Sequence, residues 1–297
     1  GGLPAPGIVW HHQPDAVLHV HALGGKAAAL LRLKQTGLAI PPWFVVLPEA
    51  GEAAAVSAAS ALASNGATQE SAPVLLAARS SARDEDRIAH SFAGQLDSFL
   101  SVPCDKVMDA VCRVRGSARS DRIRTYRREQ GLPGDAPIPA VLVQRMVVAD
   151  RAGVAFSADP VSGRRDVAVV SAVHGLGTAL VSGDSSADTW RVDGDARILD
   201  AAISHKATRH AAQPLSVNGE DAPAHEGVRA EALPPHLRET PALSEAEVLR
   251  VAALARACQQ HFGRPQDIEW AFENGALWLL QSRPITSLAR MPDPGAP

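Results

Sequence analysis

Residues 267–284, DIEWAFENGALWLLQSRP, predict a β-hairpin, because two apolar runs flank an Asn-Gly pair. Side chains alternate between the two faces of a strand, so the length of the turn decides which residues share a face. A two-residue turn would pair Phe272 with Leu277. A three-residue loop over residues 273–275, with its glycine in the left-handed conformation and a bulge behind it, would pair Phe272 with Ala276.

We predict the three-residue loop, because it places Glu269 and Gln281 on one face, whereas the two-residue turn separates them. One face then carries Ile268, Trp270, Phe272, Ala276, Trp278 and Leu280. The other face carries Asp267, Glu269, Ala271, Leu277, Leu279, Gln281 and Arg283. A carboxylate beside an amide offers oxygen ligands to a hard cation, and an arginine offers a fork to phosphate. A sheet surface with ordinary ion pairs is the alternative, so other segments must decide.

Composition and charge exclude several classes of protein. The chain has 297 residues, enough for one large domain or two modest ones. Its 29 basic and 32 acidic residues give a net charge of -3 without a long basic stretch, so we expect no nucleic-acid partner. No apolar stretch is long enough to span a bilayer, so we expect no membrane contact. The three cysteines lack CxxC spacing, which favours reduced thiols in the cytoplasm over disulfides or a zinc site.

Helix and strand signals are mixed along the chain. Predicted helices cover residues 24–38, 50–63, 105–130 and a stretch that begins at the Ser244 cap. Predicted strands cover residues 74–79 and the apolar runs AVLVQRMV, GVAFSADPVSG, DVAVVSAVHGLG and DTWRVD. Because strands and helices do not alternate regularly, the pattern favours an α+β fold over a doubly wound sheet.

Two glycine-containing segments could contact phosphate. GGK at residues 24–26 places Lys26 near a helix N-terminus, where backbone N–H groups and an ammonium can bind phosphate together. It is not a Walker A loop, because the required Gly and the Ser or Thr are missing. RSSARDEDRIAHSFAGQ, residues 79–95, joins Arg79 to a loop around Gly94 that could close over phosphates. Solvated surface segments are the alternative for both.

These motifs resemble, in order, those of one family of nucleotide-binding domains. The ATP-binding domain of phosphoenolpyruvate synthase and pyruvate phosphate dikinase, which also occurs in rifampin phosphotransferase, is similar to this chain at LGGKAAAL, AARSSARDED with SFAGQ, VLVQRMV, GVAFSADPVSG, GLGTALVSG, RPQDIEWA and LLQSRPIT. The resemblance covers nearly the whole chain. It implies an ATP-grasp fold, in which two α+β subdomains, expected at residues 1–138 and 139–297, enclose a nucleotide.

The resemblance implies roles in phosphate binding for residues of the first subdomain and of the hairpin. Lys26, Arg79 and Arg283 correspond to the catalytic cations that contact the phosphates of ATP. Ser91 and Gly94 belong to the loop that corresponds to the phosphate lid.

The resemblance also implies an adenine-binding hinge and a metal site in the second subdomain. The backbone of four residues corresponds to the hinge that faces adenine: Gln144, Arg145, Met146 and Val147. Glu269 and Gln281 correspond to ligands of Mg2+, and none of the 11 histidines is assigned to metal. The implied cofactors are ATP and Mg2+, and the polar face of the hairpin is expected to form the floor of their site.

The sequence departs from the family at three places. Thr178 stands where the family usually has Glu after GLG, and Trp43 stands where Gly commonly follows Pro-Pro. The family passes phosphate through a histidine on a separate domain, in a GG-x2-SH segment, and the SH of ISHKATRH at residues 203–210 lacks the preceding glycines.

We therefore expect an ATP-dependent phosphotransferase of the kinase or dikinase type. Its acceptor would be a phosphohistidine domain, in cis or in trans, or a small molecule. An ATP-grasp ligase that forms an acyl phosphate and a non-catalytic nucleotide-binding regulatory module are the alternatives.

Overall fold

The computed structural model of the chain describes residues 6–64, 73–81, 98–120, 124–125, 128, 131, 137–214 and 227–286. The chain forms two compact units. Unit 1 comprises Gly1–Arg32, Pro41–Met146 and Ala212–Val228. Unit 2 comprises Leu33–Ile40, Val147–Ala211 and Arg229–Pro297. Each unit therefore contains segments from both sides of residue 138, where the sequence suggested a single division.

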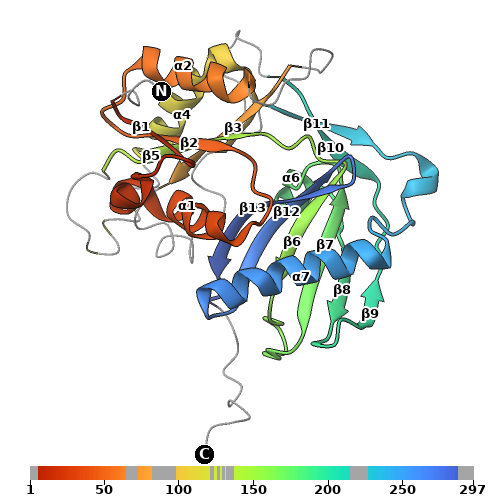
Figure 1. Cartoon of the computed structure of the whole chain (residues 1–297). Coiled ribbons are helices and arrows are strands. Elements are labelled where there is room, and N and C mark those ends of the chain that lie inside the picture. Colours follow the sequence, from red (N-terminus) through yellow and green to blue (C-terminus); the bar gives the residue numbers. More distant parts are fainter. Residues whose placement is uncertain are drawn as a thin grey trace, which may run out of the picture. The chain divides into compact units, whose positions relative to one another are not determined.

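Unit 1 contains a five-stranded antiparallel sheet with the strand order β1-β2-β5-β3-β4 (Figure 1). Its strands are β1 (Ile8–Trp10), β2 (Trp43–Val46), β5 (Ala140–Arg145), β3 (Leu76–Ser81) and β4 (Ser98–Val102). Strand β2 is buried along its whole length, as its continuous apolar run WFVV indicates. Helices α2 (Glu52–Ser64) and α4 (Val107–Ser117) pack their alanine and valine residues on the sheet and complete the core of this unit.

Unit 2 contains a six-stranded antiparallel sheet with the strand order β13-β12-β6-β7-β8-β9. Its strands are β13 (Ala276–Pro284), β12 (Gln266–Glu273), β6 (Arg151–Phe156), β7 (Ala168–His174), β8 (Asp188–Val192) and β9 (Ile198–Ala202). Helix α7 (Glu245–Phe262) runs along one face of this sheet and buries its apolar side there (Figure 1). The hairpin of β12 and β13, with its polar face, therefore belongs to a sheet whose other face is covered by a long helix.

The start of α7 agrees with the sequence. The Ser244 hydroxyl accepts a hydrogen bond from the Glu247 N–H, and the Glu247 carboxylate accepts one from the Ser244 N–H, which forms the predicted capping box. Helix α1 (Val20–Leu33) belongs to unit 1 for nearly all of its length, and the remaining regular elements are short. They are α6 (Thr178–Ser182), β10 (Thr208–Ala212), β11 (Val228–Ala232) and the 3-10 turns Ala16–His19, Lys34–Thr36, Cys104–Lys106 and Pro235–Leu237. Across the described part of the chain, none of the helices has the length and apolar character needed to cross a membrane.

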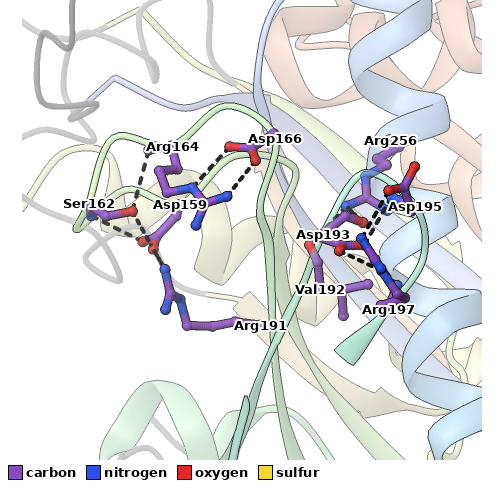
Figure 2. A network of polar contacts seen from close by, with 10 residues as sticks. All are labelled: Asp159, Ser162, Arg164, Asp166, Arg191, Val192, Asp193, Asp195, Arg197 and Arg256. Carbon is purple, nitrogen blue, oxygen red and sulfur yellow. Dashed lines mark hydrogen bonds and ion pairs between the residues drawn. The ribbon is translucent and has the colours of Figure 1, made fainter. Parts of the chain in front are cut away.

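Two groups of polar side chains brace loops of unit 2 (Figure 2). Burial disfavours ionisation of Asp159, but hydrogen bonds from Ser162, from backbone N–H groups and from Arg191 of β8 outweigh it and hold the pKa of this carboxyl below its usual value. Arg256 of α7 donates to the carbonyl oxygen of Asp193 at 2.6 Å, which ties the helix to the turn after β8. Because these charged side chains have their partners within unit 2, we interpret both groups as contacts that stabilise its fold.

The hairpin of β12 and β13 closes with a two-residue turn, so the predicted three-residue loop is wrong. Phe272 pairs with Leu277, as the rejected alternative required. The φ angles of Asn274 and Gly275 are 50° and 80°, and a type I′ turn needs such left-handed values at both central positions. Asn-Gly is the favoured pair for this turn, because both residues tolerate a positive φ.

A β-bulge next to Glu269 nevertheless brings the polar residues into the predicted pairs. Leu280 is the extra residue on β13, and beyond it Glu269 lies opposite Gln281 and Asp267 lies opposite Arg283. The shared face of these four residues is thus correct, although the turn that was expected to produce it is not.

The apolar residues of β13 lie on the faces opposite to those predicted. Leu277 and Leu279 pack with Trp270 in the core beneath α7. Trp278 and Leu280 pack near Ala271 in a smaller cluster on the other face. The reason is the length of the turn, because a shift of one residue exchanges the faces of the strand as far as the bulge.

Candidate functional site

The GGK segment forms a close backbone contact in unit 1. Helix α1 (Val20–Leu33) is interrupted at Gly24, whose φ of 78° and ψ of 171° are not helical. A Cβ atom at this position would lie 1.7 Å from the carbonyl oxygen of Ser81, so only glycine fits. The prediction that a helix begins at these glycines is confirmed, because two helices meet at a kink at Gly24 and the second begins just after it, against the end of β3.

Ser81 fixes the segment that carries Lys26. Its hydroxyl donates to the carbonyl oxygen of Leu23 at 2.6 Å and accepts from the Ala27 N–H at 3.2 Å. The ammonium of Lys26 donates to the carbonyl oxygen of Ser80 at 3.2 Å. Since these bonds hold the residues on both sides of Lys26 as well as its ammonium, the cation has a defined position at the end of β3.

Arg79 precedes Ser80 on β3, so the structure brings the two cations predicted for unit 1 to the same strand end. Its backbone pairs with Leu142 of the neighbouring strand β5, and its side chain is half-buried. The proposed lid residues Ser91 and Gly94 lie outside the described residues.

The predicted adenine hinge is the end of β5 and the residues that follow it. The side-chain amide of Gln144 donates to the carbonyl oxygen of Pro41 at 3.1 Å and is almost fully buried. The backbone N–H groups of Arg145 and Met146 each donate at 2.9 Å to carbonyl oxygens of adjacent segments. The chain passes from unit 1 to unit 2 between Met146 and Val147. The hinge is therefore fixed to unit 1 up to Met146.

The polar residues of β12 and β13 form two cross-strand pairs in unit 2. Glu269 lies opposite Gln281, and the Nε of Arg283 donates to the Asp267 carboxylate at 2.8 Å. Burial raises the pKa of Asp267; the Arg283 guanidinium opposes this rise and the Glu269 carboxylate adds to it. The ion pair orients Arg283, because the guanidinium binds a carboxylate that is itself held in the sheet.

The pair of Glu269 and Gln281 is chemically suited to Mg2+. A carboxylate and an amide carbonyl are hard oxygen donors, and their direct pairing places both on one side of the hairpin. Mg2+ commonly takes only one or two protein ligands and completes its shell with water and substrate phosphates. Within the ranges that the structure describes, no group of three or more His, Cys, Asp or Glu residues could hold a metal ion. Two oxygen ligands from the protein thus suit an ion that also binds the phosphates of a substrate better than an ion held by the protein alone.

Residues 47–295 match the family described as pyruvate phosphate dikinase, AMP/ATP-binding domain. The chain belongs to this family. The family resemblance stated from the motifs is confirmed, and so is the mixture of helices and antiparallel sheets expected of an α+β fold. The description of this family names AMP and ATP as the nucleotides that its domains bind.

Three curated relatives of this dikinase-type domain are longer proteins. The chain is 34% identical to the rifampicin phosphotransferase of Bacillus subtilis over 218 residues, which cover 73% of the chain and 24% of the relative. It is 32% identical to the prodigiosin synthesizing transferase PigC of Serratia marcescens over 313 residues, 96% of the chain and 34% of the relative. It is 39% identical to a probable phosphoenolpyruvate synthase of Methanothermobacter thermautotrophicus over 217 residues, which cover 72% of the chain and 30% of the relative. The chain spans about a quarter to a third of the length of these relatives.

The chain also contains a row of three hydrogen-bonded side chains that the sequence did not predict. The hydroxyl of Thr178, the residue that departs from the usual Glu, lies 2.9 Å from Nδ1 of His210. The Nε2 of His210 lies 3.1 Å from the carboxylate of Asp184. The departure at Thr178 was visible in the sequence, but its partner is 32 residues away and no local spacing connects the two.

Proposed function

We propose that the chain is the nucleotide-binding part of a Mg2+- and ATP-dependent phosphotransferase. It would pass a phosphoryl or pyrophosphoryl group from ATP to a phosphate-accepting histidine domain, in cis or in trans, or to a small-molecule acceptor. The observation that carries the proposal is the pairing of Glu269 with Gln281 beside the Asp267–Arg283 ion pair, in a chain of an AMP/ATP-binding family.

Three cations are proposed to contact the phosphates. They are Lys26, Arg79 and Arg283, each assigned by the resemblance of its own motif. Transfer of a phosphoryl group requires positioning and stabilisation of the negative charge on its oxygens, which fixed cations provide without reorganisation. The contacts that hold Lys26 to Ser80 and Arg283 to Asp267 supply this fixed geometry.

Glu269 and Gln281 are the proposed protein ligands of Mg2+. When bound, the ion neutralises charge on the phosphates of ATP. The backbone of Gln144–Val147 is proposed to orient adenine, and the loop with Ser91 and Gly94 to cover the phosphates. These assignments follow the resemblance residue by residue.

Chromatography of nucleotides after incubation with Mg2+ and ATP tests the proposal. The chain alone should hydrolyse ATP very slowly, because in-line transfer needs an acceptor held at near-attack distance. Addition of a separate phosphate-accepting histidine domain should produce AMP. Lys26→Met should abolish this production, whereas Lys34→Met, at an exposed lysine, should not change it.

The other outcomes identify the alternative functions. Formation of ADP only with a carboxylate substrate would indicate an acyl-phosphate ligase. ATP binding without turnover under any condition would indicate a regulatory nucleotide-binding module. Rapid stoichiometric release of AMP by the chain alone would contradict the proposal that the acceptor comes from another domain or molecule.

A further inference from the structure

Ser101 has an unusual backbone conformation for a residue inside a strand. Its φ is 52°, in the left-handed region, although it lies within β4. Among the described residues other than glycine, only Ala196 and Asn274 share a positive φ, and both lie in turns between adjacent strands. Serine does not favour this conformation, so the surrounding contacts must enforce it.

The conformation belongs to a β-bulge on an edge strand. Between the paired positions, β4 has two residues, Leu100 and Ser101, where β3 has only Ala77. Strand β4 is the last strand of the sheet in unit 1. A bulge rotates the backbone and redirects the groups of the extra residue. Here it directs the N–H of Ser101 toward the residue that follows β5.

Ser101 connects two other segments of unit 1. Its N–H donates to the sulfur of Met146 at 3.0 Å, and its hydroxyl donates to the carbonyl oxygen of Gly227. The side chain of Ser101 is fully buried and that of Met146 is nearly so. The backbone N–H of Met146 also donates to the carbonyl oxygen of Leu75 at 2.9 Å. Side chain and backbone of Met146 are thus fixed from two adjacent segments, and the bulge supplies one of the two contacts.

We propose that Ser101 is a positioning residue for recognition of the base of the bound nucleotide. This inference rests on the proposed function, in which the backbone of Gln144–Val147 orients a purine. A backbone segment recognises a base by the direction of its N–H and C=O groups, so its dihedral angles must be held before the ligand arrives. Ser101, in its left-handed conformation, holds the dihedral angles of this segment through its hydrogen bond to Met146. The backbone conformation of Ser101 contributes more to this positioning than its hydroxyl does.

Two substitutions separate the conformation from the hydroxyl. Ser101→Ala removes the bond to Gly227, and alanine then relaxes toward an ordinary negative φ and withdraws the N–H from Met146. Ser101→Gly removes the same hydroxyl, but glycine keeps a positive φ without strain. Ser204→Ala is the matched control, because the Ser204 hydroxyl also donates to a backbone carbonyl, that of Ala187 at 2.8 Å, and forms no hydrogen bond with those proposed nucleotide-binding residues that the structure describes.

The experiment measures dissociation constants for ATP and for inorganic tripolyphosphate, which lacks the base, by calorimetry. We expect Ser101→Ala to weaken ATP binding by about tenfold, equivalent to one lost hydrogen bond, and to change tripolyphosphate binding less than about twofold. Ser101→Gly and Ser204→Ala should bind both ligands as the unsubstituted chain does. Met146→Leu, which keeps the volume but removes the sulfur acceptor, should reproduce the loss for ATP alone.

Two patterns of results would overturn the inference. If Ser101→Ala and Ser101→Gly weaken the binding of ATP equally, the hydroxyl of Ser101 and not its backbone conformation affects nucleotide binding. If ATP and tripolyphosphate weaken together, or ATP affinity does not change in the Ala and Leu variants, Ser101 has only a role in the fold. Failure of the proposed function gives a different result, because the unsubstituted chain would then bind neither ligand.

Discussion

Substitution of Gly24 tests the geometry that places Lys26. In Gly24→Ala the new Cβ would lie 1.7 Å from the carbonyl oxygen of Ser81, whereas real Cβ contacts stay above 3.0 Å, so the segments must separate by at least about 1.3 Å. The φ of 78° with a ψ of 171° lies in a region that essentially only glycine occupies, and it adds about 1–3 kcal/mol for a residue with a Cβ. Separation also breaks the 2.6 Å bond from Ser81 to Leu23, which contributes about 1 kcal/mol. The overpacked contact adds about 1 kcal/mol or more, so we expect a total loss of stability of at least about 3–5 kcal/mol.

Gly37→Ala is the matched control for this substitution. Gly37 has a φ of 74°, close to that of Gly24, but no atom lies within 4 Å of its hypothetical Cβ. It should therefore lose only about 1 kcal/mol, from the backbone conformation alone. Urea denaturation measures both values, and calorimetry measures ATP affinity under conditions in which both variants remain folded.

The affinity for ATP should fall by about tenfold or more in Gly24→Ala, because the ammonium of Lys26 moves with the displaced segment. In Gly37→Ala it should stay within about twofold. Equal stability and equal ATP affinity of the two variants would refute the reasoning, because the contact between Gly24 and β3 would then be unnecessary.

Three further substitutions in unit 2 have distinct expected results. Glu269→Ala should abolish the tightening of ATP binding by Mg2+ in calorimetry, while Glu245→Ala, at an exposed carboxylate, should retain it. Because burial raises the pKa of Asp267, its folded state binds more protons than its unfolded state, so its contribution to stability is present at low pH and is lost as the pH rises through the raised pKa. Asp267→Asn should remove this loss in urea titrations between about pH 3 and about pH 7, and an unchanged pH profile would contradict the assignment. Asp188→Asn should destabilise the fold by about 3–5 kcal/mol, because it leaves the fully buried ammonium of Lys206 without its carboxylate, and a loss below about 1 kcal/mol would contradict this account.

The hairpin illustrates how far the sequence predicts the site. Alternation and the Asn-Gly pair correctly predicted two strands, and the choice of a three-residue loop placed Glu269 and Gln281 on one face, where they do lie. The predicted cause was wrong. The turn has two residues, and the bulge at Leu280 shifts the register by one residue in the part of the hairpin beyond it, where Glu269 and Gln281 lie. A bulge depends on how the strand packs on its neighbours, here β12 and the residues beneath α7, and such packing leaves no local sequence signal.

The contacts of Lys26 depend on residues that are distant in sequence. Ser81 is 54 residues from Ala27, and only the folded sheet brings the two together. The conformation of Ser101 was also not predictable, because serine at a φ of 52° opposes its own preference and persists only through tertiary contacts. By contrast, the capping box of Ser244 and Glu247 involves residues three positions apart and was predicted correctly.

Calorimetric titration of the chain with ATP, with Mg2+ and with a chelator, tests the central claim most directly. The account predicts saturable binding at one site, tighter with Mg2+, and a rise in stability of about 2.7 kcal/mol at about a hundred times the dissociation constant. The same titration with Lys26→Met should show weaker binding. Absence of binding at about 1 mM ATP with Mg2+, by a chain that is folded, would contradict the claim that this protein is an ATP-binding domain.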